Sequence, residues 1–276
     1  MAEQGLMQDR TDQDAGGASG EGVRVAAITG ATRGVGRELA IGLARSGIAV
    51  AILGRDLAAG QAVAGQIADA GGQALAIAAD VTDEHSMARA AAQAADALGV
   101  ADALVCAAGT SLGKAPIHTQ DLAGYRQCFD TNVLGIATAL KAFLPAMIAQ
   151  GGGRIVAIGG TYGHKGVAEQ ALYASSKWAV RGLIKSIARE VGQHGITANV
   201  IAPGGIEGEK LRGLFARSAE RQGTTADAVM ADFLKGAALG RLVDGDDILA
   251  ALLHLLGPGG RNITGQDIVI DAGTVI

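Results

Sequence analysis

The sequence predicts an α/β domain: a doubly wound, parallel, seven-stranded sheet with helices on both faces. Short runs rich in Val, Ile and Ala alternate with longer segments of helical periodicity. The short runs lack the polar alternation of a half-exposed strand, which indicates strands buried on both faces, as in a parallel sheet covered by helices. A chain of 276 residues with 49% hydrophobic content is long enough to bury one such core.

Each expected element follows from the place where an apolar run ends and a helical pattern begins. The expected strands are 23–29, 49–53, 74–79, 103–106, 154–158, 197–201 and 267–270. The expected helices are 35–46, 56–70, 83–98, 132–149, 172–191 and 246–256. Strands and helices in this alternating order predict a single domain over residues 23–276.

Two segments stand apart from this alternation. Residues 1–22 are rich in Gln, Asp, Gly and Ser and lack the apolar core of a signal peptide, so they are expected to form a disordered N-terminal tail. Residues 206–236 are polar and follow the sixth strand. Because loops at the carboxyl ends of parallel strands surround the ligand crevice, this segment is expected to be a partly helical substrate lid.

Composition argues against several classes of partner. The net charge is -4 and the basic residues are scattered, so a nucleic-acid partner is not expected. No uninterrupted run reaches the roughly 20 apolar residues that cross a bilayer, so a membrane is not expected either. The two cysteines form no CxxC pair, which favours a cytoplasmic location. The histidines show no metal-ligand spacing, and no metal is predicted.

Tyr173 and Lys177 are the most informative pair in the chain. They lie four residues apart in a predicted helix and therefore share one face of it. A phenol has an ordinary pKa of about 10, and a neighbouring ammonium group favours its ionised form. The spacing therefore predicts that the two side chains act together in acid/base catalysis.

A glycine-rich turn lies about 140 residues before this pair. It follows the first predicted strand and opens the first predicted helix, which is the context of a dinucleotide site. Small residues let the pyrophosphate approach the backbone, and the free N–H groups of the helix N-terminus favour an anion. The predicted cofactor-binding residues of this turn are Gly30, Thr32, Arg33, Gly34, Val35 and Gly36.

Together, and in this order, the two motifs resemble the classical short-chain dehydrogenase/reductase family, and the resemblance covers residues 23–276. It implies a Rossmann-like fold that binds a nicotinamide cofactor. It implies that Tyr173 is the acid/base. It also implies that Lys177 lowers the pKa of the Tyr173 phenol and contacts the cofactor ribose. Asn132 matches the asparagine that, in the family, holds a water connecting the lysine to solvent.

The end of the second strand decides which nicotinamide cofactor is expected. Gly54 stands where NAD-preferring members of the family usually carry aspartate, and Arg55 follows it. Arg33 and Arg55 could both bind a 2'-phosphate through charge-assisted hydrogen bonds. NADP(H) is therefore predicted, with NAD(H) less favoured. The alternative is that both arginines are solvated surface groups and that Asp56 neutralises Arg55.

The resemblance extends to further cofactor contacts. Asp80 and Val81 resemble the adenine contact, although an aspartate after a strand is also an ordinary helix cap. Cys106 replaces the first asparagine of the family's Asn-Asn-Ala-Gly segment and is interpreted as a small buried residue. The remaining predicted cofactor-binding residues are Ala107, Gly109, Pro203, Gly204 and Ile206.

One member of the family's catalytic set is missing. The serine expected 13 residues before Tyr173 is replaced by Gly160. Thr161 is the predicted replacement, although successive residues of a regular strand point to opposite faces and a bend is then required. Tyr162 and His164 are the other local alternatives.

These motifs predict an oxidoreductase that transfers a hydride between NADP(H) and a secondary alcohol or ketone, a small-molecule substrate. Two alternatives stay open: a catalytically impaired cofactor-binding regulatory or scaffold protein, and a lyase or epimerase on the same fold. The resemblance also implies a homotetramer or homodimer, built partly through the helices that begin near Asn132 and Leu172.

Overall fold

The structure is a computed structural model that describes residues 22–111 and 113–276. The predicted tail therefore lies outside the described residues except for Gly22. The seven strands are β1 (Val25–Thr29), β2 (Ala49–Gly54), β3 (Ala74–Ala78), β4 (Ala103–Cys106), β5 (Gly153–Ile158), β6 (Ile196–Pro203) and β7 (Asp267–Ile270). They form one parallel sheet in the order β3-β2-β1-β4-β5-β6-β7, which confirms the predicted fold class.

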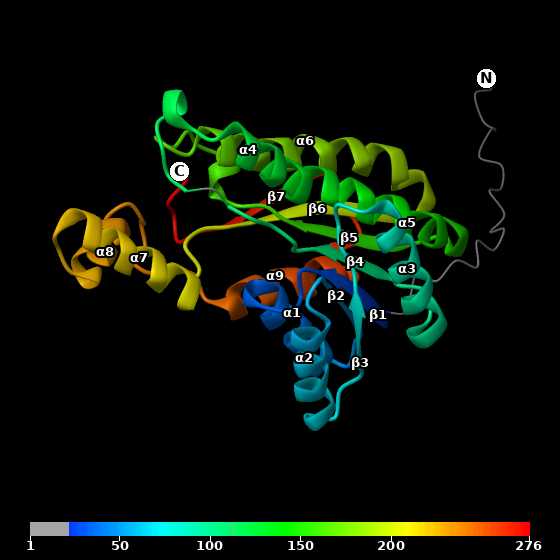
Figure 1. The fold of residues 1–276 in the computed structure, drawn as a ribbon. Coiled ribbons are helices and arrows are strands. Elements are labelled where there is room, and N and C mark those ends of the chain that lie inside the picture. The colour runs from blue at the N-terminus through cyan, green and yellow to red at the C-terminus, as the bar shows by residue number, and fades with distance from the viewer. Residues whose placement is uncertain (1–21, 112) are drawn as a thin grey trace, which may run out of the picture.

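Helices cover both faces of this sheet (Figure 1). They are α1 (Gly34–Arg45), α2 (Leu57–Asp69), α3 (Glu84–Leu98), α4 (Leu122–Phe129), α5 (Gly135–Gln150), α6 (Ala171–Val191), α7 (Glu209–Gln222), α8 (Ala226–Leu234) and α9 (Gly245–Leu256). Buried residues of α1, α2 and α9 form one core cluster with the sheet. Buried residues of α3, α5 and α6 form the other. The fold is therefore doubly wound, and its strand order reverses between β1 and β4.

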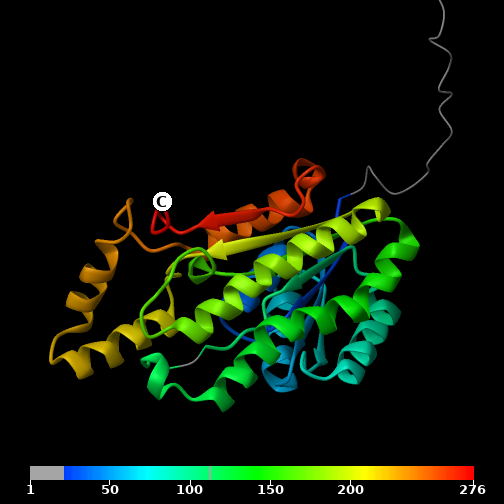
Figure 2. The same cartoon turned by 90° about the horizontal axis from the view of Figure 1, so that it is seen from above.

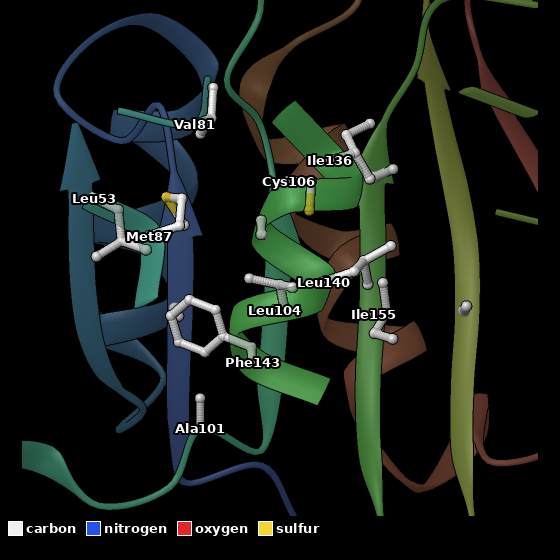
Figure 3. Close-up of a cluster of buried hydrophobic side chains, with 14 of the residues drawn as sticks. Leu53, Val81, Met87, Ala101, Leu104, Cys106, Ile136, Leu140, Phe143 and Ile155 are labelled. Atoms are coloured by element: carbon white, nitrogen blue, oxygen red, sulfur yellow. The ribbon is translucent and has the colours of Figure 1, made fainter. Parts of the chain in front are cut away.

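The periodicity of α5 explains how one of these clusters is built. Ile136, Leu140, Phe143 and Met147 recur at helical spacing and are all buried. In Figure 3, Leu140 lies beside Leu104 of β4 and Ile155 of β5, whereas Ile136 lies at the level of Cys106. Burial of each such side chain contributes roughly 1.5–3 kcal/mol, so this helix is fixed on the sheet by its apolar face.

The helix predicted at 132–149 begins earlier than the sequence pattern indicated. Asp121 caps α4 by accepting hydrogen bonds from the amides of Ala123 and Gly124 at 2.9 and 3.0 Å. A π-helical turn, Asp130–Leu134, then joins α4 to α5. The whole run Leu122–Gln150 has 29 residues, and an 18-residue window within it has a mean hydropathy of 1.6, so the run could span a membrane by length and composition alone. The core helix of a soluble protein passes the same test.

Residues 206–236 contain α7 and α8, which confirms the expectation that this segment is partly helical. The two helices project from the body of the domain beside the carboxyl ends of the strands (Figures 1 and 2). The rings of Phe215 and Phe233 pack together with their centroids 5.5 Å apart. The role of this segment as a lid stays a prediction.

Candidate active site

Every predicted site residue follows the carboxyl end of a strand or lies on a helix beside that edge. The glycine turn follows β1, the segment Ala107–Gly109 follows β4, and Gly160 follows β5. The amides of Ala107 and Ala108 donate to the backbone oxygen and to the hydroxyl of Thr29, both at 3.2 Å, which ties the β4 loop to the β1 loop. The site therefore forms where the strand order reverses, the usual ligand crevice of such a sheet.

The turn after β1 requires its glycines. Gly30 has a φ of 70°, and a Cβ there would lie 2.6 Å from the Cα of Ala108. A Cβ on Gly36 would overlap the carbonyl oxygen of Gly30. Gly34 has a φ of 56° and nothing within 4 Å of its Cβ position. Arg33, the N-cap of α1, makes no side-chain cap, so the first amides of α1 remain suited to an anion such as a pyrophosphate.

Arg33 and Arg55 are both exposed beside this turn. Asp56 caps α2 by accepting from the amide of Ala59 at 3.0 Å, so its carboxylate is already engaged. No ion pair of either arginine occurs among residues 22–111 and 113–276. The charge of Arg55 acts on Asp80, which places this guanidinium near the end of β3.

Gly54 is restricted by a neighbour that the sequence did not reveal. A Cβ at this position would lie 2.5 Å from the Cγ2 atom of Thr32. An aspartate at residue 54, as expected in an NAD-preferring relative, would therefore displace the Thr32 side chain. Thr32 and Gly54 together favour a site without an acid at the end of β2.

Asp80 is not the N-cap of α3, because Asp83 has that role. The Oδ1 atom of Asp80 accepts from the amide and the hydroxyl of Thr82 at 2.9 and 2.8 Å. These hydrogen bonds, led by the amide of Thr82, lower the pKa of Asp80. Asp80 is therefore ionised at neutral pH and can accept from an adenine amine. Val81 beside it is buried against Gly135, where a Cβ would lie 2.7 Å from the Cγ2 atom of Val81.

The segment after β6 leaves no room for a side chain at Gly204. A Cβ on Gly204 would lie 2.8 Å from the Cα of Asp271, and Ile206 forms a bridge with Val243. Pro203 ends β6, and its carbonyl oxygen is one of the nearest atoms to the Cβ position of Gly160, at 3.9 Å. The segment therefore borders the catalytic side of the crevice.

Tyr173 and Lys177 lie together on the first two turns of α6, as predicted. The Nζ atom of Lys177 is 5.8 Å from the centroid of the Tyr173 ring and donates to the carbonyl oxygen of Ile158 at 3.3 Å. Lys177 is 8% exposed, so its ammonium is held between the end of β5 and the phenol. This arrangement brings a positive charge close to the phenol that is predicted to act as the acid/base.

Burial raises the pKa of Tyr173 to about 12, and the charges of Cys128 and Tyr162 act in the same direction. The phenol alone is therefore a weaker acid than a tyrosine in water. Catalysis near neutral pH requires positive charge close to the phenolate, which is what the Lys177 ammonium and an oxidised nicotinamide would supply.

The loop after β5 leaves the predicted serine position open. Gly160 has a φ of 159° and a ψ of 158°, a backbone conformation that residues other than glycine rarely adopt, and its Cβ position lies 4.0 Å from the Cε of Lys177. Residues Thr161–Gly163 form a 3-10 turn, so the alternation of a strand no longer applies to Thr161. Thr161 is 7% exposed. The Tyr162 ring packs edge-on against the Tyr173 ring, with centroids 5.8 Å apart.

His164 has different neighbours from Tyr162. Burial lowers its pKa, and the charges that act on it are those of Arg181, Asp267, Asp271 and Lys185, none of which is a predicted catalytic group. Its Nε2 atom is buried with no hydrogen-bond partner in the described part of the chain. His164 therefore faces the contact of α6 with β7, which makes it the weakest of the three local alternatives.

Asn132 lies in the π-helical turn and is 2% exposed. Its amide group bonds to the backbone of Thr110 and to Ser176, two positions that the sequence interpretation missed. Ser176 could have been noticed from its place directly before Lys177. Cys128 gives no signal in the sequence beyond its helical spacing of four residues from Asn132.

The fold and this site define a class of protein: a doubly wound oxidoreductase domain with a dinucleotide turn and a tyrosine-lysine pair. A profile of the family described as short chain dehydrogenase matches residues 24–218. The chain belongs to this family, whose members bind a nicotinamide cofactor.

Curated relatives and solved structures agree with that membership. The cis-4-hydroxycyclohexanecarboxylate dehydrogenase of Sinomonas cyclohexanicum is 34% identical over 251 residues, covering 91% of this chain and 96% of that protein. Sorbitol-6-phosphate 2-dehydrogenase from Erwinia amylovora superimposes with a TM-score of 0.87 at 28% identity, over 91% of this chain and 99% of the other. A variant of actinorhodin polyketide ketoreductase, solved with NADPH, has a TM-score of 0.86 at 27% identity, over 91% and 97%.

Proposed function

We propose that this chain transfers a hydride between NADP(H) and a secondary alcohol or the corresponding ketone. The observation that carries the proposal is the placement of Tyr173 and Lys177 on one face of α6, beside the open position at Gly160. Two similar proteins support it: the name of one specifies a hydroxycyclohexane substrate, and the name of the other specifies ketoreductase activity with bound NADPH.

Each side chain then has a chemical task. A bound nicotinamide cofactor supplies the hydride in the direction of reduction. Tyr173 donates its proton to the oxygen of the substrate as negative charge develops there, and the Lys177 ammonium stabilises the resulting phenolate. Asn132 holds the loop after β4 in place through its bonds to Thr110, at 2.8 and 3.0 Å.

The developing alkoxide needs a second donor besides Tyr173. Removal of such a donor typically lowers the rate by roughly 100 to 1,000 fold. We propose Thr161 for this role, because it stands at the start of the 3-10 turn next to the open position. Tyr162 is the second candidate, since its ring already contacts that of Tyr173.

The preference for NADP(H) rests on the end of β2. Arg33 in the turn after β1 and Arg55 after β2 are both exposed, and Asp56 is engaged as a helix cap. Thr32 occupies the space that a side chain at residue 54 would need. Two guanidinium groups, neither of which forms an ion pair within the described residues, favour the 2'-phosphate of NADP(H) over the free hydroxyl of NAD(H).

Exposed apolar residues on the outer helices support a homodimer or homotetramer. Leu134, Ile148 and Trp178 are 55%, 38% and 50% exposed on the π-turn, α5 and α6. Large exposed apolar side chains on adjacent helices are typical of a subunit interface. We propose that these helices meet their counterparts in a second copy of the chain.

The test compares cofactor use in the wild type and in the double variant Arg33→Gln, Arg55→Gln. The ratio of kcat/KM for NADPH to that for NADH should fall by about 10 to 100 fold, because each lost charged hydrogen bond is worth about 1.5–3 kcal/mol when fully formed and less at an exposed site. Arg45→Gln, at the other end of α1, is the matched control. An unchanged ratio in the double variant would show that neither arginine binds the phosphate.

A panel of ketones separates the proposed activity from its alternatives. An oxidoreductase consumes NADPH in proportion to the alcohol that it forms. A lyase or epimerase would convert a hydroxylated substrate without net change in cofactor absorbance. A regulatory or scaffold protein would bind NADPH, as measured by fluorescence titration, and convert none of the panel.

A further inference from the structure

A closed group of buried polar side chains lies behind the tyrosine-lysine pair. Asn132 is 2% exposed, and Cys128 and Ser176 are each 0% exposed. They come from three different segments, since Cys128 belongs to α4, Asn132 to the π-turn and Ser176 to α6. The backbone of Thr110, from the loop after β4, completes the group.

The hydrogen bonds of this group form a connected network. The Nδ2 atom of Asn132 lies 3.0 Å from the Thr110 carbonyl oxygen, 3.1 Å from the Ser176 hydroxyl oxygen and 3.2 Å from the Cys128 sulfur. Its Oδ1 atom accepts from the Thr110 amide at 2.8 Å. An amide group has only two N–H bonds, so the three acceptors share them. The Asn132 side chain therefore has no freedom to rotate without losing a buried hydrogen bond.

Cys128 connects to the same partners from its own side. Its Sγ atom lies 3.8 Å from the carbonyl oxygen of Thr110 and 4.0 Å from the hydroxyl oxygen of Ser176, distances within the range of sulfur hydrogen bonds. Burial raises the pKa of this thiol, so it stays neutral and can both donate and accept. It is thus a weak but fully buried member of the network.

Ser176 connects the network to α6, the helix that contains Tyr173 and Lys177. Its hydroxyl donates to the backbone oxygen of Tyr173 at 2.7 Å, while the same oxygen atom accepts from Asn132. Ser176 also directly precedes Lys177 in the chain. The segments joined in this way hold the predicted cofactor loop at Gly109, the asparagine of the π-turn and both members of the acid/base pair.

We propose that Ser176 and Cys128 are positioning residues that fix the first turn of α6, with Tyr173 and Lys177, against the loop that follows β4. Neither side chain contacts the substrate in this proposal. Both act through Asn132 and the backbone of α6. The inference rests on the proposed function, because it assigns these residues to the same reaction.

The test uses the two cysteines of the chain as a matched pair. Cys106 and Cys128 are both free and buried, at 2% and 0% exposure, but Cys106 lies in β4 and has no side-chain hydrogen bond in the described chain. Cys106→Ala and Cys128→Ala remove the same atom from a buried site, so a general loss of packing should affect both. Cys128→Ser keeps a polar group of the network, and Ser176→Ala removes the stronger link.

We expect kcat of Cys128→Ala to fall about three- to tenfold, because its three sulfur hydrogen bonds are weak and together should contribute no more than one ordinary hydrogen bond, roughly 0.5–1.5 kcal/mol. Ser176→Ala should lose more, since it breaks the bonds to the Tyr173 carbonyl oxygen and to Asn132 as well as the weak contact with Cys128. The KM for the ketone should stay within about twofold in both, as neither residue touches the substrate. Cys128→Ser should recover most of the rate, whereas Cys106→Ala should keep the wild-type kcat.

Amide hydrogen exchange gives a readout that does not need turnover. Amides of Tyr173–Lys177 should exchange faster in Cys128→Ala and Ser176→Ala than in the wild type or Cys106→Ala. Equal exchange and equal kcat in the two cysteine variants would overturn the proposal. If the wild type reduces no ketone, the proposed function fails, and the exchange comparison alone still decides whether the network positions α6.

Discussion

Two strand-to-helix loops at the same edge of the sheet contain glycine for different reasons. In the loop after β1, a Cβ on Gly30 or Gly36 would strike the backbone of a neighbouring residue. In the loop after β5, a Cβ on Gly160 would meet nothing closer than the Pro203 oxygen at 3.9 Å and the Cε of Lys177 at 4.0 Å. The first loop excludes side chains, and the second has room for one.

The difference separates a requirement of the fold from a change at the active site. The glycines after β1 keep the backbone close enough to bind a dinucleotide and cannot be replaced without moving the chain. Gly160 stands where the resemblance to the family predicts a serine, and no neighbouring atom prevents a side chain there. The absence of the predicted serine is therefore a change at the proposed active site that the packing of this protein does not demand.

The prediction with the largest expected effect changes Tyr173 of α6, beside the loop after β5, and tests whether this site is catalytic. Tyr173→Phe removes the acidic hydroxyl and keeps the ring, so kcat should fall by roughly 100 to 10,000 fold. Binding of NADPH, measured by fluorescence titration, should change by less than about threefold. Tyr125→Phe, which removes a phenol from α4, is the matched control and should retain the wild-type kcat. Turnover of Tyr173→Phe within about threefold of wild type would contradict the role of this residue.

The sequence predicted the parts of this comparison that depend on local pattern. Buried strands gave continuous apolar runs, and the glycine turn followed such a run, so both the sheet and the dinucleotide turn could be predicted. Tyr173 and Lys177 were found because helical spacing alone brings them together. These features depend on residues close to one another in the chain.

The parts that could not be predicted depend on contacts between distant segments. The clash between Thr32 and a side chain at Gly54 joins residues 22 positions apart. The bond from Asn132 to Ser176 joins residues 44 positions apart. The π-turn at Asp130–Leu134 changes the helical phase between α4 and α5, and no residue pattern marks it. The start of α4 was missed for a simpler reason, since the cap at Asp121 could have been noticed.

A smaller effect should identify the donor that replaces the serine. Thr161→Val, which is nearly isosteric, should lower kcat by roughly 10 to 1,000 fold if the Thr161 hydroxyl stabilises the alkoxide. Tyr162→Phe should then leave kcat within about threefold of wild type. The opposite result, a large loss in Tyr162→Phe alone, would move the role to the phenol that contacts Tyr173.

Gly160→Ser sharpens the same question. Because the Cβ position of residue 160 is open, the added hydroxyl can enter without displacing Lys177. We expect it to restore at least about tenfold of the kcat lost in whichever of the two variants is impaired. No recovery in either background would mean that the space at Gly160 does not face the substrate oxygen.

The difference in available space between the two loops can be tested directly by adding one methyl group to a glycine of each. Gly36→Ala places a Cβ against the Gly30 carbonyl oxygen and should destabilise the protein by about 1–3 kcal/mol while weakening NADPH binding. Gly160→Ala should cost about 1 kcal/mol, because a φ of 159° strains a residue that has a Cβ, but it should leave NADPH binding unchanged, because no atom lies closer than 3.9 Å to the added methyl group. Urea unfolding and fluorescence titration measure both. An equal loss of NADPH binding in the two variants would remove the distinction between the loops.

The smallest expected effect concerns stability at alkaline pH. Burial raises the pKa of Tyr173 to about 12, whereas a phenol in an unfolded chain ionises near 10. The unfolded state therefore loses its proton first, and the stability that is fully present below about pH 10 falls as the pH rises toward 12. At pH 11 the difference from neutral pH should be about 1.4 kcal/mol for this one group. The phenol of Tyr162 and the thiols of Cys106 and Cys128 also have raised pKa values and act in the same direction, so the wild type alone cannot isolate the contribution of Tyr173.

The free energy of unfolding should therefore be measured at pH 8 and pH 11 in the wild type, Tyr173→Phe and Tyr125→Phe. Tyr173→Phe should lose about 1.4 kcal/mol less between the two pH values than the other two proteins. An identical loss in all three would mean that the Tyr173 phenol is not desolvated in the folded chain, and that less positive charge is needed to bring it into the range of catalysis.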